Sequence, residues 1–171
     1  MKSASKSLKI RPTTSRVRKV LMDTIAGYLP GASFLDLFAG TGSVGLEAIN
    51  RGAASATFVE QDRTVLKTLR DNIEKSHLTD RCTVFPIDAI RFLKKRSDPS
   101  EFDIIFADPP YERGYLGILK HILLSPEEVR PKLIAIQVSR FELNEVRLPK
   151  DLPIRQKVIG DTVLLLIEGS Q

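Results

Sequence analysis

The sequence has a single cysteine, Cys82, so it cannot form an internal disulfide. Its two histidines, His77 and His121, leave too few ligands for a zinc site of the usual cysteine and histidine type, and we expect no bound metal. Cys82 stands in an apolar run, so we expect it to be a small buried hydrophobic residue.

Long hydrophobic runs are also absent. No stretch approaches the roughly 18 apolar residues of a membrane span, and the first ten residues lack the apolar core of a signal peptide. We therefore expect a cytoplasmic protein with no membrane partner. Tryptophan is absent and aromatic residues make up only 6%, which argues against an extended base-stacking platform.

What is present is the composition of an ordinary globular protein. The 171 residues suffice for one hydrophobic core, so residues 1–171 are expected to form a single domain. Hydrophobic residues make up 42% and charged residues 27%, which excludes a disordered chain. We expect a monomer.

The net charge of +5 is concentrated at one end, in a basic N-terminal arm over residues 1–20. No acidic residue precedes Asp23, whereas seven basic residues do: Lys2, Lys6, Lys9, Arg11, Arg16, Arg18 and Lys19. A polyanion such as a nucleic acid is a natural partner for this arm, because binding releases condensed counterions. Charge alone fits a merely solvated terminus equally well.

From residue 33 onward, short β-rich runs alternate with segments of helical period, the pattern of a doubly wound α/β sheet with helices on both faces. Strands are expected over residues 34–37, 56–60, 83–85, 103–107 and 133–138. Helices are expected over residues 14–25, 43–50, 63–76, 88–95 and 115–124. Residues 154–159 and 162–167, separated by Gly160 and Asp161, predict an antiparallel hairpin at the sheet edge.

A glycine-rich turn follows the first expected strand. Gly40, Gly42 and Gly45 satisfy the pattern G-x-G-x-x-G between a strand and a helix, where backbone can approach a nucleotide closely. Glu60 ends the next strand twenty residues after Gly40, where a carboxylate can accept both hydroxyls of an adenosine ribose.

Asp36 helps to distinguish between two ligands that could bind such a turn, NAD and S-adenosylmethionine. A dinucleotide site favours apolar residues before the first glycine, whereas here a carboxylate lies inside the strand end and needs a partner. The ammonium group of a methionine moiety would supply one, which favours S-adenosylmethionine over NAD. Loop amides that satisfy Asp36 are the alternative.

Two further acids complete a row at the strand ends. Asp88 follows the third strand and could accept the exocyclic amine of an adenine, or could only cap the next helix. Asp108 follows the fourth strand. Ligands of open parallel sheets bind outside the carboxyl ends of the strands, so we expect Asp36, Glu60, Asp88 and Asp108 to meet there.

The segment Asp108-Pro109-Pro110-Tyr111 suits transfer to an aromatic amine, whose lone pair is delocalised into the ring. Hydrogen bonds from this amine to the Asp108 carboxylate and the Pro109 carbonyl would hold the nitrogen in line and stabilise its growing positive charge. Pro109 and Pro110 stiffen the turn, and Tyr111 would stack on a base that has left its helix. A capped, proline-rich turn is the alternative.

These motifs resemble the bacterial RsmD family, which methylates the exocyclic N2 amine of one guanine in 16S ribosomal RNA with S-adenosylmethionine. The resemblance spans about residues 10–168 and is carried by Arg11-Pro12-Thr13, Arg16-Val17-Arg18, residues 35–42, residues 58–60, residues 108–111 and Gly160-Asp161-Thr162. It implies a class I methyltransferase fold of Rossmann type and a substrate within the small ribosomal subunit or an assembly intermediate.

The resemblance also assigns residues to roles. It implies that the cofactor contacts Asp36, Phe38, Gly40, Gly42, Glu60 and Asp88, that residues 108–111 position the amine, and that RNA contacts Arg11, Arg16, Arg18 and Arg113. The segment before Arg11 is shorter and less strand-like than in the family, and Ser139 and Ile159 stand where an acidic and an aromatic residue are usual.

Three other functions fit parts of the pattern. An adenine-N6 DNA methyltransferase uses the same loop but adds a recognition region for which this chain has no room. A non-catalytic nucleic-acid-binding module would keep the fold without binding the cofactor, and a nicotinamide oxidoreductase would share the glycine turn.

Overall fold

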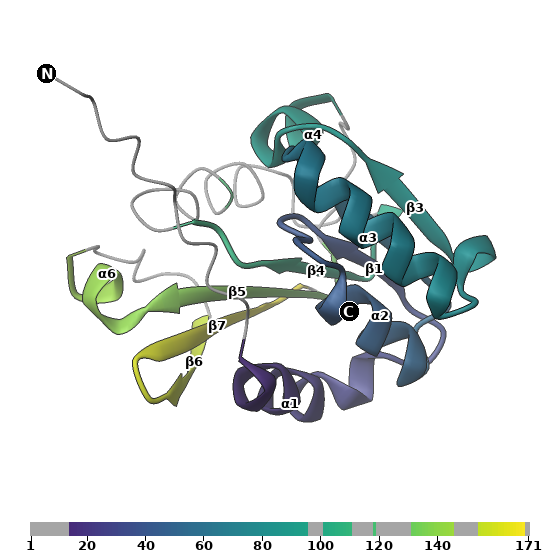
Figure 1. Ribbon diagram of the computed structural model, residues 1–171. Coiled ribbons are helices and arrows are strands. Elements are labelled where there is room, and N and C mark those ends of the chain that lie inside the picture. Colours follow the sequence, from purple (N-terminus) through teal and green to yellow (C-terminus); the bar gives the residue numbers. More distant parts are fainter. Residues whose placement is uncertain (1–13, 96–100, 111–117, 119–130, 146–153, 170–171) are drawn as a thin grey trace, which may run out of the picture.

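The structure, a computed structural model, describes residues 14–95, 101–110, 118, 131–145 and 154–169. Within these residues a seven-stranded sheet has the order β3-β2-β1-β4-β5-β7-β6 (Figure 1). The strands are β1 (Ser33–Asp36), β2 (Ser55–Val59), β3 (Cys82–Phe85), β4 (Ile104–Ala107), β5 (Leu133–Ser139), β6 (Ile154–Ile159) and β7 (Thr162–Glu168).

The sheet is parallel from β3 to β5 and antiparallel at the end that β7 and β6 occupy. β7 pairs with β5 over its whole length, from Leu133 opposite Glu168 to Ser139 opposite Thr162. The terminal hairpin therefore extends the sheet, and β6 is the strand at its edge. The expected α/β fold with a C-terminal antiparallel hairpin is confirmed.

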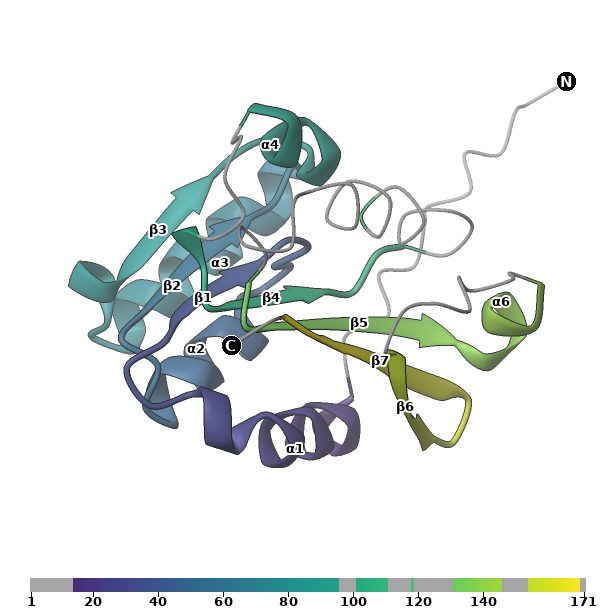
Figure 2. The same ribbon diagram turned by 180° about the vertical axis from the view of Figure 1, so that it is seen from behind.

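Helices cover both faces of the sheet (Figures 1 and 2). On one face lie α1 (Ser15–Thr24), α2 (Ser43–Asn50) and α3 (Arg63–Lys75), whose apolar side chains share one hydrophobic cluster. On the other face, α4 (Ala89–Lys95) and Ile118 contribute to a second cluster, against which Leu143 of α6 (Arg140–Glu145) packs.

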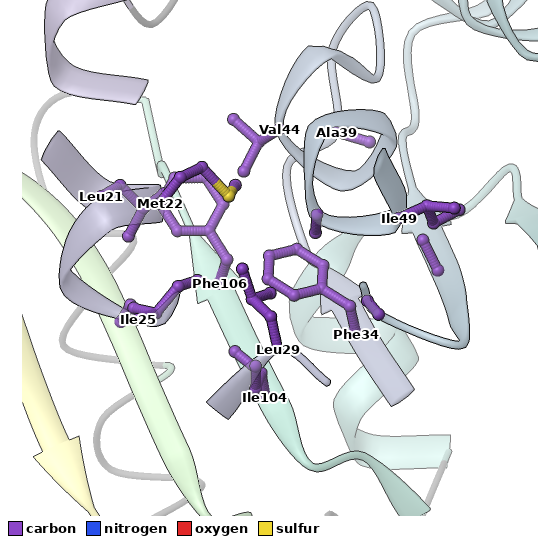
Figure 3. Close-up of a cluster of buried hydrophobic side chains, with 14 of the residues drawn as sticks. Leu21, Met22, Ile25, Leu29, Phe34, Ala39, Val44, Ile49, Ile104 and Phe106 are labelled. Carbon is purple, nitrogen blue, oxygen red and sulfur yellow. The ribbon is translucent and has the colours of Figure 1, made fainter. Parts of the chain in front are cut away.

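The central strands are buried on both sides, which explains their continuous apolar sequence. In β4, Ile104 and Phe106 belong to the first cluster, whereas Ile105 and Ala107 belong to the second, because successive side chains of a strand point to opposite faces. Figure 3 shows the first cluster, where Met22 of α1 lies beside Phe106 of β4.

Side-chain caps mark where α1 and α3 begin. Thr14 Oγ1 accepts a hydrogen bond from the Val17 amide at 3.3 Å. Asp62 Oδ1 accepts one from the Thr64 amide at 2.8 Å, and each cap satisfies a donor that the first turn would leave without a partner.

Helix α6 was not expected, although the Ser139-x-x-Glu142 pattern signals a helix start. Cys82 is half-buried against the first cluster rather than fully buried. The helix expected over residues 115–124 lies outside the described residues except for Ile118, which is helical and buried. Short 3-10 turns also occur at Ala26–Tyr28 and Thr79–Arg81.

Replacing Gly45 with Ala should destabilise the fold, because the added Cβ would overlap the Phe58 ring beneath α2. We expect the free energy of unfolding to fall by roughly 1–3 kcal/mol in chemical denaturation, as for other overpacked cores. Gly27→Ala is the matched control, since its Cβ would meet nothing within 4 Å. Equal destabilisation by both changes would contradict this interpretation.

Candidate active site

The candidate site lies where the strand order reverses. β1 is flanked by β2 on one side and β4 on the other, and all three run parallel. Ligands of open parallel sheets bind outside the carboxyl ends of the strands at such a reversal of the strand order. Asp36, Glu60 and Asp108 stand at the ends of these three strands, as the sequence predicts.

The turn from β1 to α2 depends on glycine for two different reasons. Gly40 and Gly42 have φ angles of 53° and 83°, which side chains rarely tolerate. A Cβ on Gly42 would also overlap the Leu69 side chain of α3, whereas a Cβ on Gly40 would meet nothing within 4 Å. Gly42 and Gly45 therefore allow close packing, and Gly40 faces open space in which a ligand has room.

Hydrogen bonds from two other elements hold this turn. Glu60 Oε2 accepts from the Gly40 amide at 3.0 Å, while Glu60 Oε1 accepts from the Asp62 amide at 2.8 Å. Asn72 of α3 donates from Nδ2 to the Thr41 carbonyl oxygen at 2.9 Å. Contacts within the protein thus hold the turn in place.

Asn72 was not among the residues that the sequence singled out. The hydrogen bond joins residues 31 positions apart in the sequence. The only local feature that could have indicated it is that Asn72 lies one turn after Leu69, on the same side of α3. Sequence reasoning also gave Glu60 a ribose contact alone, whereas in the structure its carboxylate holds the glycine turn.

Asp36 is the one charged side chain in the described part of the chain that is fully buried, at 1% exposure. Neither carboxylate oxygen has a hydrogen-bond partner among the described residues. The amides of Gly45 and Phe38 are oriented to lower its pKa, but neither reaches hydrogen-bonding geometry. The loop amides therefore do not satisfy this group.

Burial is the main cause that raises the pKa of Asp36 from 3.8 to about 7. The negative charge of Asp108 raises it further, and that of Glu60 adds a smaller effect. Repulsion of this kind requires proximity, so the three acids share one electrostatic environment at the strand ends. A cation brought there would relieve it.

The amine-positioning loop begins where expected. Asp108 and Pro109 follow β4 directly and are half-buried, and Pro110 is exposed. Tyr111 lies outside the described residues. The loop thus leaves β4 next to the strand that carries Asp36.

Asp88 caps α4, since its Oδ1 accepts from the Arg91 amide at 2.8 Å. Its other carboxylate oxygen makes no hydrogen bond within the described part of the chain. Beside it, a cavity of about 410 Å³ is lined by Phe85, Pro86, Ile87, Phe92 and Lys95. The capping role of Asp88 is confirmed, and its contact with an adenine stays a prediction.

The remaining predicted residues are less central. Phe38 is half-buried against the second cluster, directly before the glycine turn. Arg16 is exposed and Arg18 half-buried on α1, whereas Arg11 and Arg113 lie outside the described residues. Across the described ranges, no group of three or more His, Cys, Asp or Glu is arranged to hold a metal ion. No helix formed by these ranges is long and apolar enough to cross a bilayer.

Two features of the site fit S-adenosylmethionine. Its methionine moiety carries an ammonium and a sulfonium group, and Asp36 is a buried carboxylate without a partner in the described chain, at the end of β1. The open space beside Gly40 leaves room for a ligand against the backbone. A phosphate-rich ligand would instead meet the repulsion of three nearby carboxylates.

Comparison with solved structures confirms the fold. The chain superposes on a hypothetical protein of Thermus thermophilus with a TM-score of 0.75 and 27% identity, covering 98% of this chain and 93% of that one. An RNA methyltransferase from Salinibacter ruber in complex with S-adenosyl-L-homocysteine shares the fold, with a TM-score of 0.70 and 15% identity over 94% of this chain and 95% of that one.

Among curated proteins, "Ribosomal RNA small subunit methyltransferase D" of Escherichia coli K12 is 41% identical over 160 residues, which are 93% of this chain and 79% of that protein. The protein of the same name from Buchnera aphidicola is 30% identical over 90% of this chain and 79% of its own length. Fold, site and relatives together define a class I S-adenosylmethionine-dependent methyltransferase.

Within that class the chain belongs to the family described as "Conserved hypothetical protein 95", whose model matches residues 3–168. The resemblance to the RsmD family is thereby confirmed. Family and fold together imply the use of S-adenosylmethionine.

Replacing Asp36 with Asn should change how stability depends on pH. Between pH 3.8 and about 7 the folded protein keeps a proton that the unfolded chain releases, so this group's contribution to stability is lost as the pH rises through that window. Without cofactor, the free energy of unfolding of Asp36→Asn should equal that of wild type near pH 4. At pH 8 it should be higher than that of wild type by up to about 4 kcal/mol.

Denaturant titrations at several pH values would measure this difference. Asp71→Asn, on the exposed side of α3, is the control and should keep the pH dependence of wild type. Parallel curves for wild type and Asp36→Asn would show that burial does not perturb Asp36.

Proposed function

We propose that the protein transfers a methyl group from S-adenosylmethionine to the exocyclic N2 amine of a guanine in 16S ribosomal RNA. The observation that supports this most is the placement of Asp108 and Pro109 beside the strand that carries the buried Asp36, next to the glycine turn. The names of its relatives, which are small subunit methyltransferases of ribosomal RNA, support the substrate.

The residues for the cofactor come from three strand ends. Asp36 would receive its cationic methionine end, Gly40 would leave room for it, and Glu60 would accept from the ribose while keeping its bond to the Gly40 amide. Phe38, Gly42 and Asp88 complete the proposed contacts, with the free oxygen of Asp88 available to an adenine amine. When bound, the cofactor supplies an electrophilic methyl group on a sulfonium.

The acceptor nitrogen needs a different kind of help. Its lone pair is delocalised into the guanine ring, so the Asp108 carboxylate and the Pro109 carbonyl would accept its two hydrogens and hold it in line. Both acceptors also stabilise the positive charge that grows on this nitrogen during displacement. Proline at 109 offers no amide proton that would compete for these acceptors. Pro110 and Tyr111 would stiffen the turn and stack on the base.

The RNA would lie against the basic N-terminal arm. Arg16 is exposed on the first turn of α1, and Figures 1 and 2 both place this start of α1 on the side toward which β5 points. Arg11, Arg18 and Arg113 are the other proposed contacts. Phosphate neutralisation by such residues is independent of sequence and positions the substrate without selecting the guanine.

The test is methylation of a panel of acceptors. The protein is incubated with labelled S-adenosylmethionine and small ribosomal subunits, naked 16S RNA or duplex DNA, and the products are digested and identified by mass spectrometry. We expect N2-methylguanosine in RNA. Label only in DNA, or N6-methyladenine as the product, would overturn the proposal, and an absence of cofactor binding in calorimetry would favour the non-catalytic module.

Asp108→Ala should separate catalysis from cofactor binding. Since Asp108 is proposed to act on the acceptor amine, we expect kcat to fall by about a hundredfold or more, the scale of a lost electrostatic contact in the transition state. Single-turnover kinetics would measure the rate, and calorimetry should give a cofactor affinity close to wild type. A normal rate in the variant would remove Asp108 from the mechanism.

A further inference from the structure

Two large hydrophobic side chains are exposed in the described part of the chain, and one is aromatic. Phe141 on α6 is 74% exposed and Val158 on β6 is 56% exposed. An exposed ring of this kind has no role in the core. Its position, rigidity and surroundings point to a ligand instead.

Phe141 stands on a rigid support although α6 has only six residues. Ser139 Oγ accepts from the Glu142 amide at 3.1 Å, and the Ser139 amide donates to Glu142 Oε2 at 3.2 Å, which is a reciprocal capping box. Leu143 packs against the second hydrophobic cluster. Since residues two apart lie on nearly opposite sides of a helix, this anchor turns Phe141 outward.

The support also lies at the correct edge of the sheet. Helix α6 follows the carboxyl end of β5, which pairs in parallel with β4, and β4 delivers Asp108 and Pro109 at the same edge. The Arg140 amide donates to the Asp161 carbonyl oxygen at 2.8 Å, which ties α6 to the β6–β7 turn. Figures 1 and 2 show α6 beyond the end of β5, beside this turn.

One positive charge, that of Arg140, stands next to Phe141. Arg140, its neighbour in sequence, is exposed and has no ion-pair partner among the described residues. The Glu142 carboxylate keeps its negative charge, and its hydrogen bond from the Ser139 amide holds it at the start of α6. One aromatic ring beside a free guanidinium matches an unpaired base and its phosphate, because every base offers a π face to a ring.

We propose that Phe141 stacks on an unpaired RNA base close to the target guanine, while Arg140 neutralises a nearby phosphate. This inference rests on the proposed function. The guanine must leave its stack to reach Asp108, so neighbouring bases lose a stacking partner, and an exposed ring at the same edge can replace it.

The experiment measures the affinity of Phe141→Ala for a naked 16S RNA transcript and, separately, for S-adenosylmethionine. We expect RNA binding to weaken about 5- to 150-fold, the range of a single lost base–aromatic contact, with unchanged cofactor affinity. Phe141→Trp should restore binding, because it keeps an aromatic face. Arg140→Gln should weaken binding and reduce its dependence on salt.

Val158→Ala is the matched control, since it removes an exposed hydrophobic side chain from β6 and should leave RNA affinity within about twofold. If wild type methylates RNA but Phe141→Ala binds it normally, the stacking contact is wrong while the proposed function stands. Weaker binding to whole subunits but not to naked RNA would assign Phe141 to a protein contact. A wild type that methylates no RNA would overturn both proposals.

Discussion

The site depends on a steric constraint, the close approach of α2 to β2 and of the glycine turn to α3. Phe58 and Leu69 occupy the volume into which side chains at positions 45 and 42 would project. Only glycine allows the turn after β1 to pack this closely against them. In this position the turn backbone forms hydrogen bonds with Glu60 and Asn72. Packing in the core and preorganisation of the cofactor site are therefore consequences of the same contacts.

The second feature is an electrostatic conflict that the fold maintains. Asp36 is buried without a hydrogen-bond partner in the described chain, and Asp108 and Glu60 add repulsion. Such a group lowers the stability of the folded protein. A cationic ligand would bind more tightly for the same reason, because it relieves the repulsion and gives the buried carboxylate a partner. Functional sites commonly sacrifice stability in this way, because the interaction that satisfies the group comes from outside the chain.

The elements that sequence reasoning identified have strong local signals. Helix α2 over Ser43–Asn50 and strand β6 over Ile154–Ile159 have the predicted bounds. Strands β1 and β2 are shifted by one residue at both ends, and the other strands differ by one residue at one end. Helix α6 was missed because six residues make fewer than two turns, too few to show a helical period, although the sequence of its capping box was visible. The Asn72 contact was missed because a hydrogen bond across 31 positions leaves no periodic trace.

Local periodicity, with the rule that parallel strands end at one edge, predicts the succession of strands and of most helices, the glycine turn and the row of acids after successive strands. Tertiary packing was needed to show that Asp36 has no partner among the described residues, that Glu60 is occupied by the Gly40 amide, and that Phe141 faces outward. Burial and hydrogen-bond partners depend on which distant segments meet, and no local pattern encodes that.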